Sequence, residues 1–420
     1  MPVRKLARKA AVVGAGMSRF GSFPEVSSRD LFVEAFLEMA ASVDKGLDAG
    51  DIEALYVGNY SSDLFEGQGH IAPIMADWAG LTPIPATRIE DACASGGVAL
   101  RQAVLAVASG IHDVVLVGGV EKMTALPTER VTDVLASASD VLYELPAGFT
   151  FPGLYAAMAT AYMHRYGTTS EQLMMVAVKN HSNGALNPKA QFKSSIRQIM
   201  EGRAERARQR GQSVPAWASE LDFMRDPAAN PVVAWPLRLF DCSPVTDGAA
   251  CLLVVAEELA ASFSRCPLHI AGTGQASGPA LHDREELTSI ASARLAAQQA
   301  YDMAGLRPQD IQIAEVHDCF TIAEVVATED LGFFPPGQGA RFAAEGATAR
   351  DGAMPVNTSG GLKAKGHPVG ASGVAQVVEV WRQLRGEAGP RQVPKEVRRA
   401  LTHNVGATGG TTVVHIFERG

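Results

Sequence analysis

The amino-acid sequence predicts an α/β protein built from two similar halves, with an extra lobe inserted into the first half. Three observations lead to this prediction: an internal repeat, apolar strand-like runs that alternate with helix-like segments, and one long stretch without a counterpart elsewhere. Alternation of strands and helices at this spacing is typical of α/β units. A chain of 420 residues is long enough for two or three domains.

The internal repeat is read from two segments that share one register. Residues 46–57, GLDAGDIEALYV, and residues 305–316, GLRPQDIQIAEV, have Gly-Leu, Asp-Ile and a final Val in common. Each follows an apolar run that ends in Gly-x-Gly and then a helix-like segment, Asp30–Ala41 in one half and Glu286–Ala304 in the other. We interpret the repeat as two similar α/β halves packed face to face.

A second pair of related segments extends the repeat. Residues 94–110, ASGGVALRQAVLAVASG, are echoed by residues 371–386, ASGVAQVVEVWRQLRG, and each leads toward an apolar strand. Residues 121–239 have no counterpart in the second half, and a structureless loop of that length is unexpected inside a compact domain. We therefore predict a lobe there, after which the first half resumes at a buried strand over Ala249–Ala256.

These segments divide the chain into three predicted domains. The N-terminal half comprises residues 1–120 together with 240–262, residues 121–239 form the inserted domain, and the C-terminal half comprises residues 263–420. The insertion thus interrupts the first half and does not separate the two halves.

Composition narrows the classes of function. A formal net charge of -8 argues against nucleic acid as a partner, because neutralising phosphates requires a clustered basic face. The sequence has no apolar stretch of about 18 residues, the length typical of a membrane span, and no signal peptide precedes the first strand-like run. Five scattered cysteines do not form a disulfide framework in a chain of this size, so we predict a cytoplasmic protein.

The sequence around Cys93 is compatible with a reactive cysteine. The segment EDACASGGVA, residues 90–99, places Cys93 directly before two glycines and a helix-like run. A helix N-terminus presents unpaired N–H groups and partial positive charge, so we expect it to lower the pKa of this thiol. A buried structural cysteine would fit the local sequence equally well. The segment alone leaves the two interpretations balanced.

Further chemistry-bearing residues lie at strand ends in the second half. His317, Asp318 and Cys319 follow the repeat's strand, His367 precedes the repeat's helix, and the segment THNVGATGG holds Asn404 and Gly406. The repeat aligns residues 94–96 with 371–373, which brings His367 to the same end of its half as Cys93. A thiol beside an imidazole and a second thiol suits acyl transfer. A zinc site at residues 317–319 is disfavoured, because no second Cys or His lies at a recurring ligand spacing.

Together these segments resemble the thiolase family. The motifs EDACASGG, VLVGGVEKM, SPVTDGAA, HDCF and GHPVGASG occur in the family's order along nearly the whole chain. HDCF and VKNHSNGALNPKAQF are similar to the subgroup that includes the thiolase part of sterol carrier proteins. Ordinary thiolases have Asn-Glu-Ala-Phe in place of HDCF and a cysteine in place of Asn404. The resemblance implies a duplicated five-layer αβαβα core with an inserted loop domain.

The resemblance also implies a mechanism, a reversible Claisen condensation on coenzyme A thioesters. Cys93 would attack the 3-oxo carbon of a 3-oxoacyl-CoA, and His367 would take the thiol proton. The enolate of acetyl-CoA would then be stabilised by His367 and by a water held by His317, which together form an oxyanion hole. A second oxyanion hole would use the backbone N–H groups of Cys93 and Gly406.

Two more residues acquire roles from the resemblance. Cys319, the displaced second cysteine, would protonate the enolate carbon, and in the synthetic direction it would remove that proton. Asp318 beside it would tend to raise its pKa by repulsion between like charges. The inserted lobe would bind the nucleotide and pantetheine of coenzyme A, and Ser243 matches the serine that contacts the pantetheine. The resemblance thus implies an acyltransfer enzyme, an acetyl-CoA C-acyltransferase or C-acetyltransferase.

The resemblance implies no bound cofactor and no metal, with coenzyme A and acyl-CoA as substrates. A homodimer is expected because residues 85–96 read as a strand leading into Cys93, which needs a neighbour on its exposed edge; a tetramer is also compatible. Two alternatives stay open: a decarboxylating ketoacyl-synthase-like enzyme using Cys93 with two histidines, and a non-catalytic or aldolase-type subunit working with a small accessory protein. Those aldolases lack the reactive cysteine that this chain retains.

Overall fold

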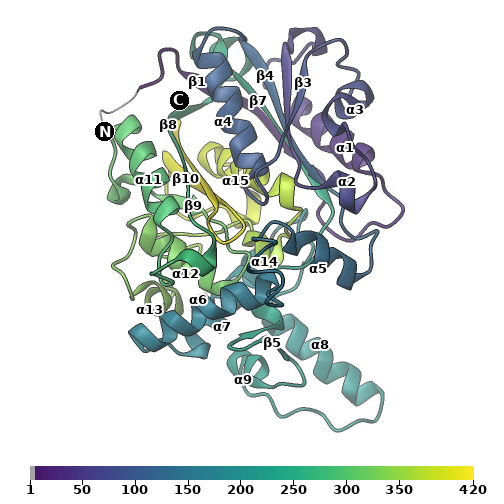
Figure 1. Cartoon of the computed structure of the whole chain (residues 1–420), viewed down its shortest axis with the longest axis vertical. Coiled ribbons are helices and arrows are strands. Elements are labelled where there is room, and N and C mark those ends of the chain that lie inside the picture. The colour runs from purple at the N-terminus through teal and green to yellow at the C-terminus, as the bar shows by residue number, and fades with distance from the viewer. Residues whose placement is uncertain (1–4) are drawn as a thin grey trace.

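The structure, a computed structural model, describes residues 5–420 (Figure 1). The first four residues of the predicted N-terminal half lie outside this range. Nine strands form one mixed sheet in the order β3-β2-β4-β7-β1-β8-β11-β10-β9. In chain order they are β1 (Ala10–Met17), β2 (Ala54–Gly58), β3 (Ala86–Ile89), β4 (Val114–Glu121), β7 (Gly248–Ala256), β8 (Leu268–Ser277), β9 (Ile313–Glu315), β10 (Arg399–Gly406) and β11 (Thr411–Arg419).

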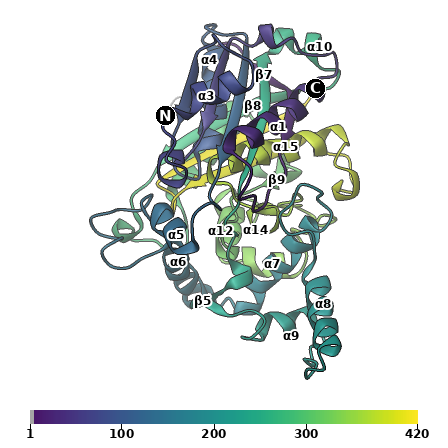
Figure 2. The same cartoon turned by 90° about the vertical axis from the view of Figure 1, so that its right-hand side faces the viewer.

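The helices cover both faces of this sheet and build the inserted segment (Figures 1 and 2). They are α1 (Ser28–Ala41), α2 (Ser62–Phe65), α3 (Ile71–Trp78), α4 (Ser95–Ala108), α5 (Thr128–Ala136), α6 (Phe151–Tyr166), α7 (Ser170–Gly184), α8 (Ile196–Gln209), α9 (Glu220–Arg225), α10 (Ala260–Phe263), α11 (Ala291–Ala304), α12 (Thr321–Asp330), α13 (Gly339–Ala344), α14 (Gly361–Ala364) and α15 (Ser372–Arg385). No helix within residues 5–420 is both long and apolar enough to cross a bilayer.

The strand order has the symmetry that the repeat predicts. In the first half β2 pairs parallel with β4, which pairs antiparallel with β7, and β7 pairs antiparallel with β1. In the second half β9, β10, β11 and β8 repeat these pairings in the same sequence. The half-sheets meet where β1 and β8 pair through Ala11 with His269 and Val12 with Leu268. The counterpart of β3 is reduced to an isolated bridge between Ala314 and Val356.

Alternating side chains sort the core into layers. On β1, Ala10 and Val12 face a central cluster that includes α4, α15 and residues of both half-sheets, whereas Ala11 and Val13 face α1 and α3. On the far side of the second half-sheet, α11 and α12 pack against β11 through Val414 and its neighbours. The layers are therefore outer helices, the first half-sheet, the paired helices α4 and α15, the second half-sheet and a second set of outer helices. This order confirms the five-layer prediction.

The inserted segment contains α5 to α9 and a small hairpin of β5 (Val232–Ala234) and β6 (Leu237–Arg238). Helices α7, α8 and α9 share a small apolar cluster around Phe223, and the part that holds α8 and α9 projects from the body of the molecule in Figure 2. Helices α6 and α7 also share an apolar cluster with α12, α13 and α14 of the second half. The insertion therefore forms one wall of the region where the two halves meet.

Candidate active site

Cys93 lies at the entrance of α4, as the sequence predicts. It precedes the N-cap Ala94, and the helix begins at Ser95. The turn is braced because the Ser95 hydroxyl accepts from the Asp91 N–H at 2.9 Å and donates to the Ala92 carbonyl at 2.6 Å. Ala92 has φ of 48°, in the left-handed region that non-glycine residues seldom occupy. Such backbone strain clusters at functional sites, and here it lies in the residue directly before Cys93.

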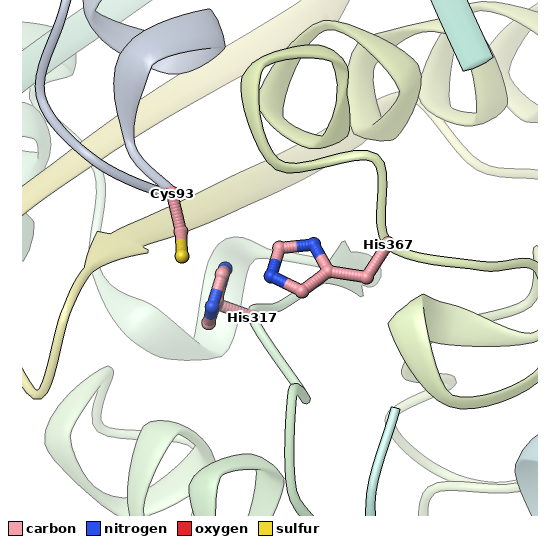
Figure 3. Close-up of side chains that lie close together, drawn as sticks. All are labelled: Cys93, His317 and His367. Atoms are coloured by element: carbon pink, nitrogen blue, oxygen red, sulfur yellow. The ribbon is translucent and has the colours of Figure 1, made fainter. Parts of the chain in front are cut away.

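Two histidines converge on this thiol (Figure 3). His317 follows β9 and His367 precedes α15, and the two rings meet edge to face with centroids 5.1 Å apart. The Cys93 sulfur and one nitrogen from each ring lie within 4.8 Å of one another. The two halves therefore contribute to one cluster, at the place where the repeat relates Cys93 to His367.

A cavity of about 170 Å³ opens beside the cluster. Several of the predicted residues line it, namely Cys93, Ser243, Cys319 and His367, together with the thiol Cys242. Its other walls are mainly apolar, from Met123, Leu135, Phe151, Val245 and Val369. Gly406 and His317 do not line it. Gly406 lies against the Asp91 carbonyl, where an added Cβ would come within 2.6 Å, and its neighbour Ala407 faces the cavity instead.

The electrostatics of Cys93 differ from the sequence expectation. Burial raises the pKa of the Cys93 thiol to about 12, and the nearby Glu121 carboxylate adds to this. The Ala407 backbone N–H donates to the sulfur and lowers the pKa, but it does not offset the burial. The expected lowering of the pKa by the helix N-terminus is therefore wrong for this structure, because desolvation of the charged sulfur outweighs the helix dipole.

His367 is arranged to accept the proton of that thiol. Its Nδ1 atom lies 2.6 Å from the Ser372 hydroxyl, which also lies 2.9 Å from the Pro368 carbonyl oxygen. A carbonyl can only accept, so the serine proton points to Pro368 and the serine oxygen accepts from Nδ1–H. Burial lowers the pKa of His367 to about 3, so the ring is neutral and its Nε2 carries a lone pair. His367 can therefore act as a base toward Cys93.

Cys319 is a second thiol in the same cavity. Burial raises its pKa well above the ordinary value, and the like charges of Cys93 and Asp318 raise it further, as the sequence predicts for Asp318. Donation from the Tyr155 hydroxyl to a Cys319 thiolate would oppose this shift. In this structure the single Tyr155 hydroxyl proton is donated to the Ala407 carbonyl at 2.9 Å. A neutral thiol held in this way can deliver a proton to a carbanion.

Asp318 is fixed away from bulk water. It accepts from the Leu362 N–H at 2.6 Å and from the Asn180 amide at 2.7 Å, and burial raises its pKa to about 7. Gly361 allows this contact, because its φ is +59° and a Cβ there would lie 2.2 Å from the carboxylate. Asp318 thus holds α14, the helix that precedes His367, close to Cys319, which follows Asp318 in the chain.

A thiolate and two imidazoles are also metal ligands. Cys93, His317 and His367 form a group of side chains that could hold an ion such as zinc. This set differs from the segment 317–319 that the sequence raised as a metal candidate. The opposing burial shifts in the pKa values of Cys93 and His367 favour a neutral thiol and a neutral imidazole, the pair needed for proton transfer within acyl chemistry.

Comparison with known proteins agrees with this geometry. The family model described as the thiolase N-terminal domain matches residues 10–258, and the thiolase C-terminal domain-like model matches residues 274–419. The chain belongs to the thiolase family. Both models keep the two halves in the order of the thiolase fold, and the resemblance read from the sequence motifs is confirmed.

Relatives of this thiolase cover almost its whole length. It is 48% identical to an acetyl-CoA acetyltransferase of Methanothermobacter thermautotrophicus, over 98% of this chain and 100% of the relative. It is 31% identical to sterol carrier protein 2 of Bos taurus, over 99% of this chain and 73% of the relative. Among solved structures, an Ltp2-ChsH2(DUF35) aldolase has a TM-score of 0.79 at 28% identity, with 98% of each chain covered.

The structure adds residues to this thiolase site that the sequence did not single out. Ala407 and Tyr155 contact the two thiols, and Ser372 contacts His367. Ser372 could have been found, because the segment ASG that carries it is the counterpart of the segment that follows Cys93. Tyr155 could not, since it comes from α6 in the inserted segment, which has no counterpart in the repeat.

Proposed function

We propose that this chain catalyses the reversible thiolysis of 3-oxoacyl-CoA, and in reverse the condensation of acetyl-CoA with an acyl-CoA. The observation that carries the proposal is that Cys93, Cys319 and His367 line one cavity, with a ring nitrogen of His367 within 4.8 Å of the Cys93 sulfur. Thiolysis needs a nucleophile that becomes acylated and a second group that exchanges a proton with the acetyl-CoA carbon.

In the first half-reaction the Cys93 sulfur forms a bond to the 3-oxo carbon while its proton passes to His367 Nε2. The bond between C2 and C3 then breaks, and its electron pair stays on C2 of acetyl-CoA as an enolate. Cys319 donates a proton to C2, which releases acetyl-CoA and leaves Cys93 as a thioester. N–H donors toward the enolate oxygen from His317 and His367, the latter after it has gained the proton, would stabilise this charge.

In the second half-reaction the thiol of coenzyme A loses its proton to the Cys319 thiolate and its sulfur attacks the acyl-Cys93 carbonyl. The bond between Cys93 and the acyl group then breaks, and the Cys93 thiolate takes back its proton from the His367 imidazolium. The backbone N–H groups of Cys93 and Gly406 remain the proposed donors for this oxyanion. Ala407 is an additional candidate, because its N–H already contacts the sulfur. Ser243 lines the cavity beside Cys319, where it could contact the pantetheine arm.

The small apolar cavity supports a short acyl group as substrate. Its volume of about 170 Å³ is less than the roughly 300 Å³ at which sites for larger ligands begin. The test is a thiolysis assay on 3-oxoacyl-CoAs of graded chain length, followed by mass spectrometry of the intact protein. A single acyl group that is removed by hydroxylamine and is absent in Cys93→Ala supports the proposal. Undiminished labelling of Cys93→Ala contradicts it.

A decarboxylating condensing enzyme is the second candidate. The convergence of one cysteine and two histidines favours it, since His317 and His367 lie with Cys93 within 4.8 Å. Cys319 in the same cavity favours thiolysis instead, because decarboxylation generates the carbanion without removal of a proton from carbon. Consumption of malonyl-CoA without turnover of 3-oxoacyl-CoA would identify the decarboxylating reaction.

We also propose a homodimer, a cytoplasmic location and the three-domain division set out from the sequence. Strand β3 supports the dimer because it ends the sheet with one partner, β2, and leads directly to Cys93. The five free cysteines support a reducing compartment. The similarity to the Ltp2-ChsH2(DUF35) aldolase supports a test for a small accessory protein, in which thiolysis is measured with and without the added protein. Light scattering that shows a stable monomer would contradict the dimer.

A further inference from the structure

The side-chain amide of Asn404 links Cys93 to His317, and both of its polar atoms have hydrogen-bond partners. Asn404 lies on β10 and is 2% exposed. Its Oδ1 accepts from the Gly97 N–H at 3.2 Å, and its Nδ2 donates to the Cys93 carbonyl at 2.9 Å. The same Nδ2 lies 3.2 Å from Nδ1 of His317.

The two backbone contacts determine which way the amide points. A backbone N–H can only donate and a backbone carbonyl can only accept, so Oδ1 faces Gly97 and Nδ2 faces Cys93. The second hydrogen of Nδ2 is then directed at His317 Nδ1, which must offer a lone pair. A neutral imidazole with a lone pair on Nδ1 carries its proton on Nε2.

The remaining nitrogen of His317 has no partner within the described chain. His317 is 1% exposed, and its Nε2 is buried without a hydrogen bond to any of residues 5–420. Burial and the nearby His367 and His403 lower the pKa of His317 far below its ordinary value, so the ring is neutral. A buried N–H without an acceptor is costly, unless a ligand supplies the acceptor. The ring belongs to the cluster with Cys93 and His367, where such a ligand would react.

We propose that Asn404 is a positioning residue that holds His317 as the Nε2–H tautomer, opposite to His367, which Ser372 holds as the Nδ1–H tautomer. One imidazole then donates toward the thioester oxygen while the other accepts the proton of Cys93. The donation to substrate rests on the proposed function, whereas the tautomers do not. Asn404 occupies the position where ordinary thiolases have their second cysteine, so its amide serves a different purpose in this chain.

The competing explanation is structural. Asn404 also ties β10 of the second half to α4 of the first, and its loss would disturb that junction whatever the state of His317. Asn230 offers a matched control in the inserted segment. It is fully buried, its Oδ1 accepts from the Phe240 N–H at 3.0 Å, and its Nδ2 donates to the Met224 carbonyl at 2.9 Å. It has no hydrogen bond to a histidine within residues 5–420.

The test uses the full chain labelled with ¹⁵N-histidine, because ¹⁵N chemical shifts distinguish protonated from unprotonated ring nitrogens. Signals of His317 and His367 are assigned by comparison with His317→Gln and His367→Gln. In the wild type we expect His317 with its proton on Nε2 and His367 with its proton on Nδ1. A proton on Nδ1 of His317 overturns the proposal.

The variant Asn404→Asp tests whether Asn404 determines the tautomer of His317. Its carboxylate keeps an acceptor for Gly97 but presents a second acceptor to His317, so Nδ1 of His317 is expected to gain a proton. Exchange of deuterium into the methyl group of acetyl-CoA should fall about 10²- to 10³-fold at pH 8, as expected for loss of an oxyanion donor. Asn230→Asp should change neither measurement. Unchanged His317 signals in Asn404→Asp overturn the positioning role.

If Asn404→Asp does not fold, Asn404→Ala replaces it. The ring then loses its fixed partner, and the His317 signals are expected to move to the average of the two tautomers; a retained Nε2–H signal overturns the proposal. A wild type with the expected tautomers that thiolyses no 3-oxoacyl-CoA refutes the proposed function and leaves the assignment of the tautomers intact.

Discussion

The Ser372 hydroxyl lies 2.6 Å from Nδ1 of His367, at the first residue of helix α15. The same hydroxyl is directed to the Pro368 carbonyl, so it is available to Nδ1 only as an acceptor. Ser372 therefore determines which nitrogen of His367 faces Cys93 with a lone pair. The protonation of His367, the base that activates Cys93, therefore depends on a contact with a residue five positions later in the chain.

Ser372→Ala should slow the acetylation of Cys93 by about 10- to 100-fold, part of the contribution of a positioned base. Without the serine oxygen, Nδ1–H loses its acceptor, and the tautomer with the proton on Nε2 becomes accessible. The rate is measured by mass spectrometry after rapid mixing with acetyl-CoA. Ser292→Ala is the control, because Ser292 is a buried serine that donates to the Gly409 carbonyl without contact to a catalytic histidine. Equal rates in the two variants would refute the role of Ser372.

Cys93 and His367 should form a neutral pair in the resting enzyme, because burial raises the pKa of Cys93 to about 12 and lowers that of His367 to about 3. The thiolate fraction then rises tenfold with each pH unit. Alkylation of Cys93 by iodoacetamide is expected to increase about tenfold per unit between pH 7 and 9, without a plateau. Peptide mapping measures this rate. A rate that is independent of pH over this range would show a preformed thiolate–imidazolium pair.

Cys319→Ala should separate acylation from carbon–carbon chemistry. Acetylation of Cys93 requires the nucleophile, the base and oxyanion donors, whereas thiolysis also requires a proton at C2 of acetyl-CoA. We expect acetylation to persist while thiolysis and deuterium exchange into the acetyl methyl group fall about 10²- to 10⁴-fold. All three rates are measured on one folded sample.

The third thiol of the cavity, Cys242, provides a matched control for this experiment. Cys242 lines the same cavity, but its Sγ donates to the Arg238 carbonyl at 3.4 Å. Cys242→Ala should therefore preserve thiolysis. If Cys319→Ala leaves all three rates near those of the wild type, Cys319 is only a packed thiol, and Asp318 or His317 becomes the candidate for proton transfer.

The repeat made much of the fold predictable. It indicated the helices now seen as α1, α4 and α15 to within one or two residues at each end, because their apolar periodicity and flanking turns are local features. It also placed His367 beside Cys93, since related helices in related halves start at the same edge. Residues 286–290, predicted as helix, precede the observed start of α11 at Ala291.

The electrostatic state of the site was not predictable. The pKa of Cys93 depends on burial by segments that are distant in sequence, including Met123, Phe151 and Ala407, which share its cavity. Asn404 reaches the Cys93 carbonyl across 311 positions and His317 across 87 positions. Local patterns carry no information on such contacts. The sequence could locate the reacting groups, but their protonation is set by tertiary structure.

His415 gives a prediction about stability that is independent of catalysis. This residue of β11 is 1% exposed, its Nε2 lies 3.0 Å from the Gly97 carbonyl, and burial lowers its pKa to about 4. Its pKa in the unfolded chain is about 6.5. Above that value the ring is neutral in both states and has no effect on pH dependence. As the pH falls from about 6.5 to about 4, the unfolded chain binds a proton that the folded protein does not, so stability is lost.

His415→Gln removes this titration while its amide can still donate to the Gly97 carbonyl. At neutral pH the variant should be the less stable protein, because the buried site is shaped for an imidazole. Between pH 6 and pH 4.5 the difference in free energy of unfolding should narrow by about 1 kcal/mol per pH unit, close to the limit of about 1.4 for one proton. Urea denaturation at a series of pH values measures it, with His164→Gln on the exposed face of α6 as the control. A difference that stays constant with pH would mean that His415 is protonated in the folded protein, and its contact with Gly97 would then have to be an ion–dipole pair.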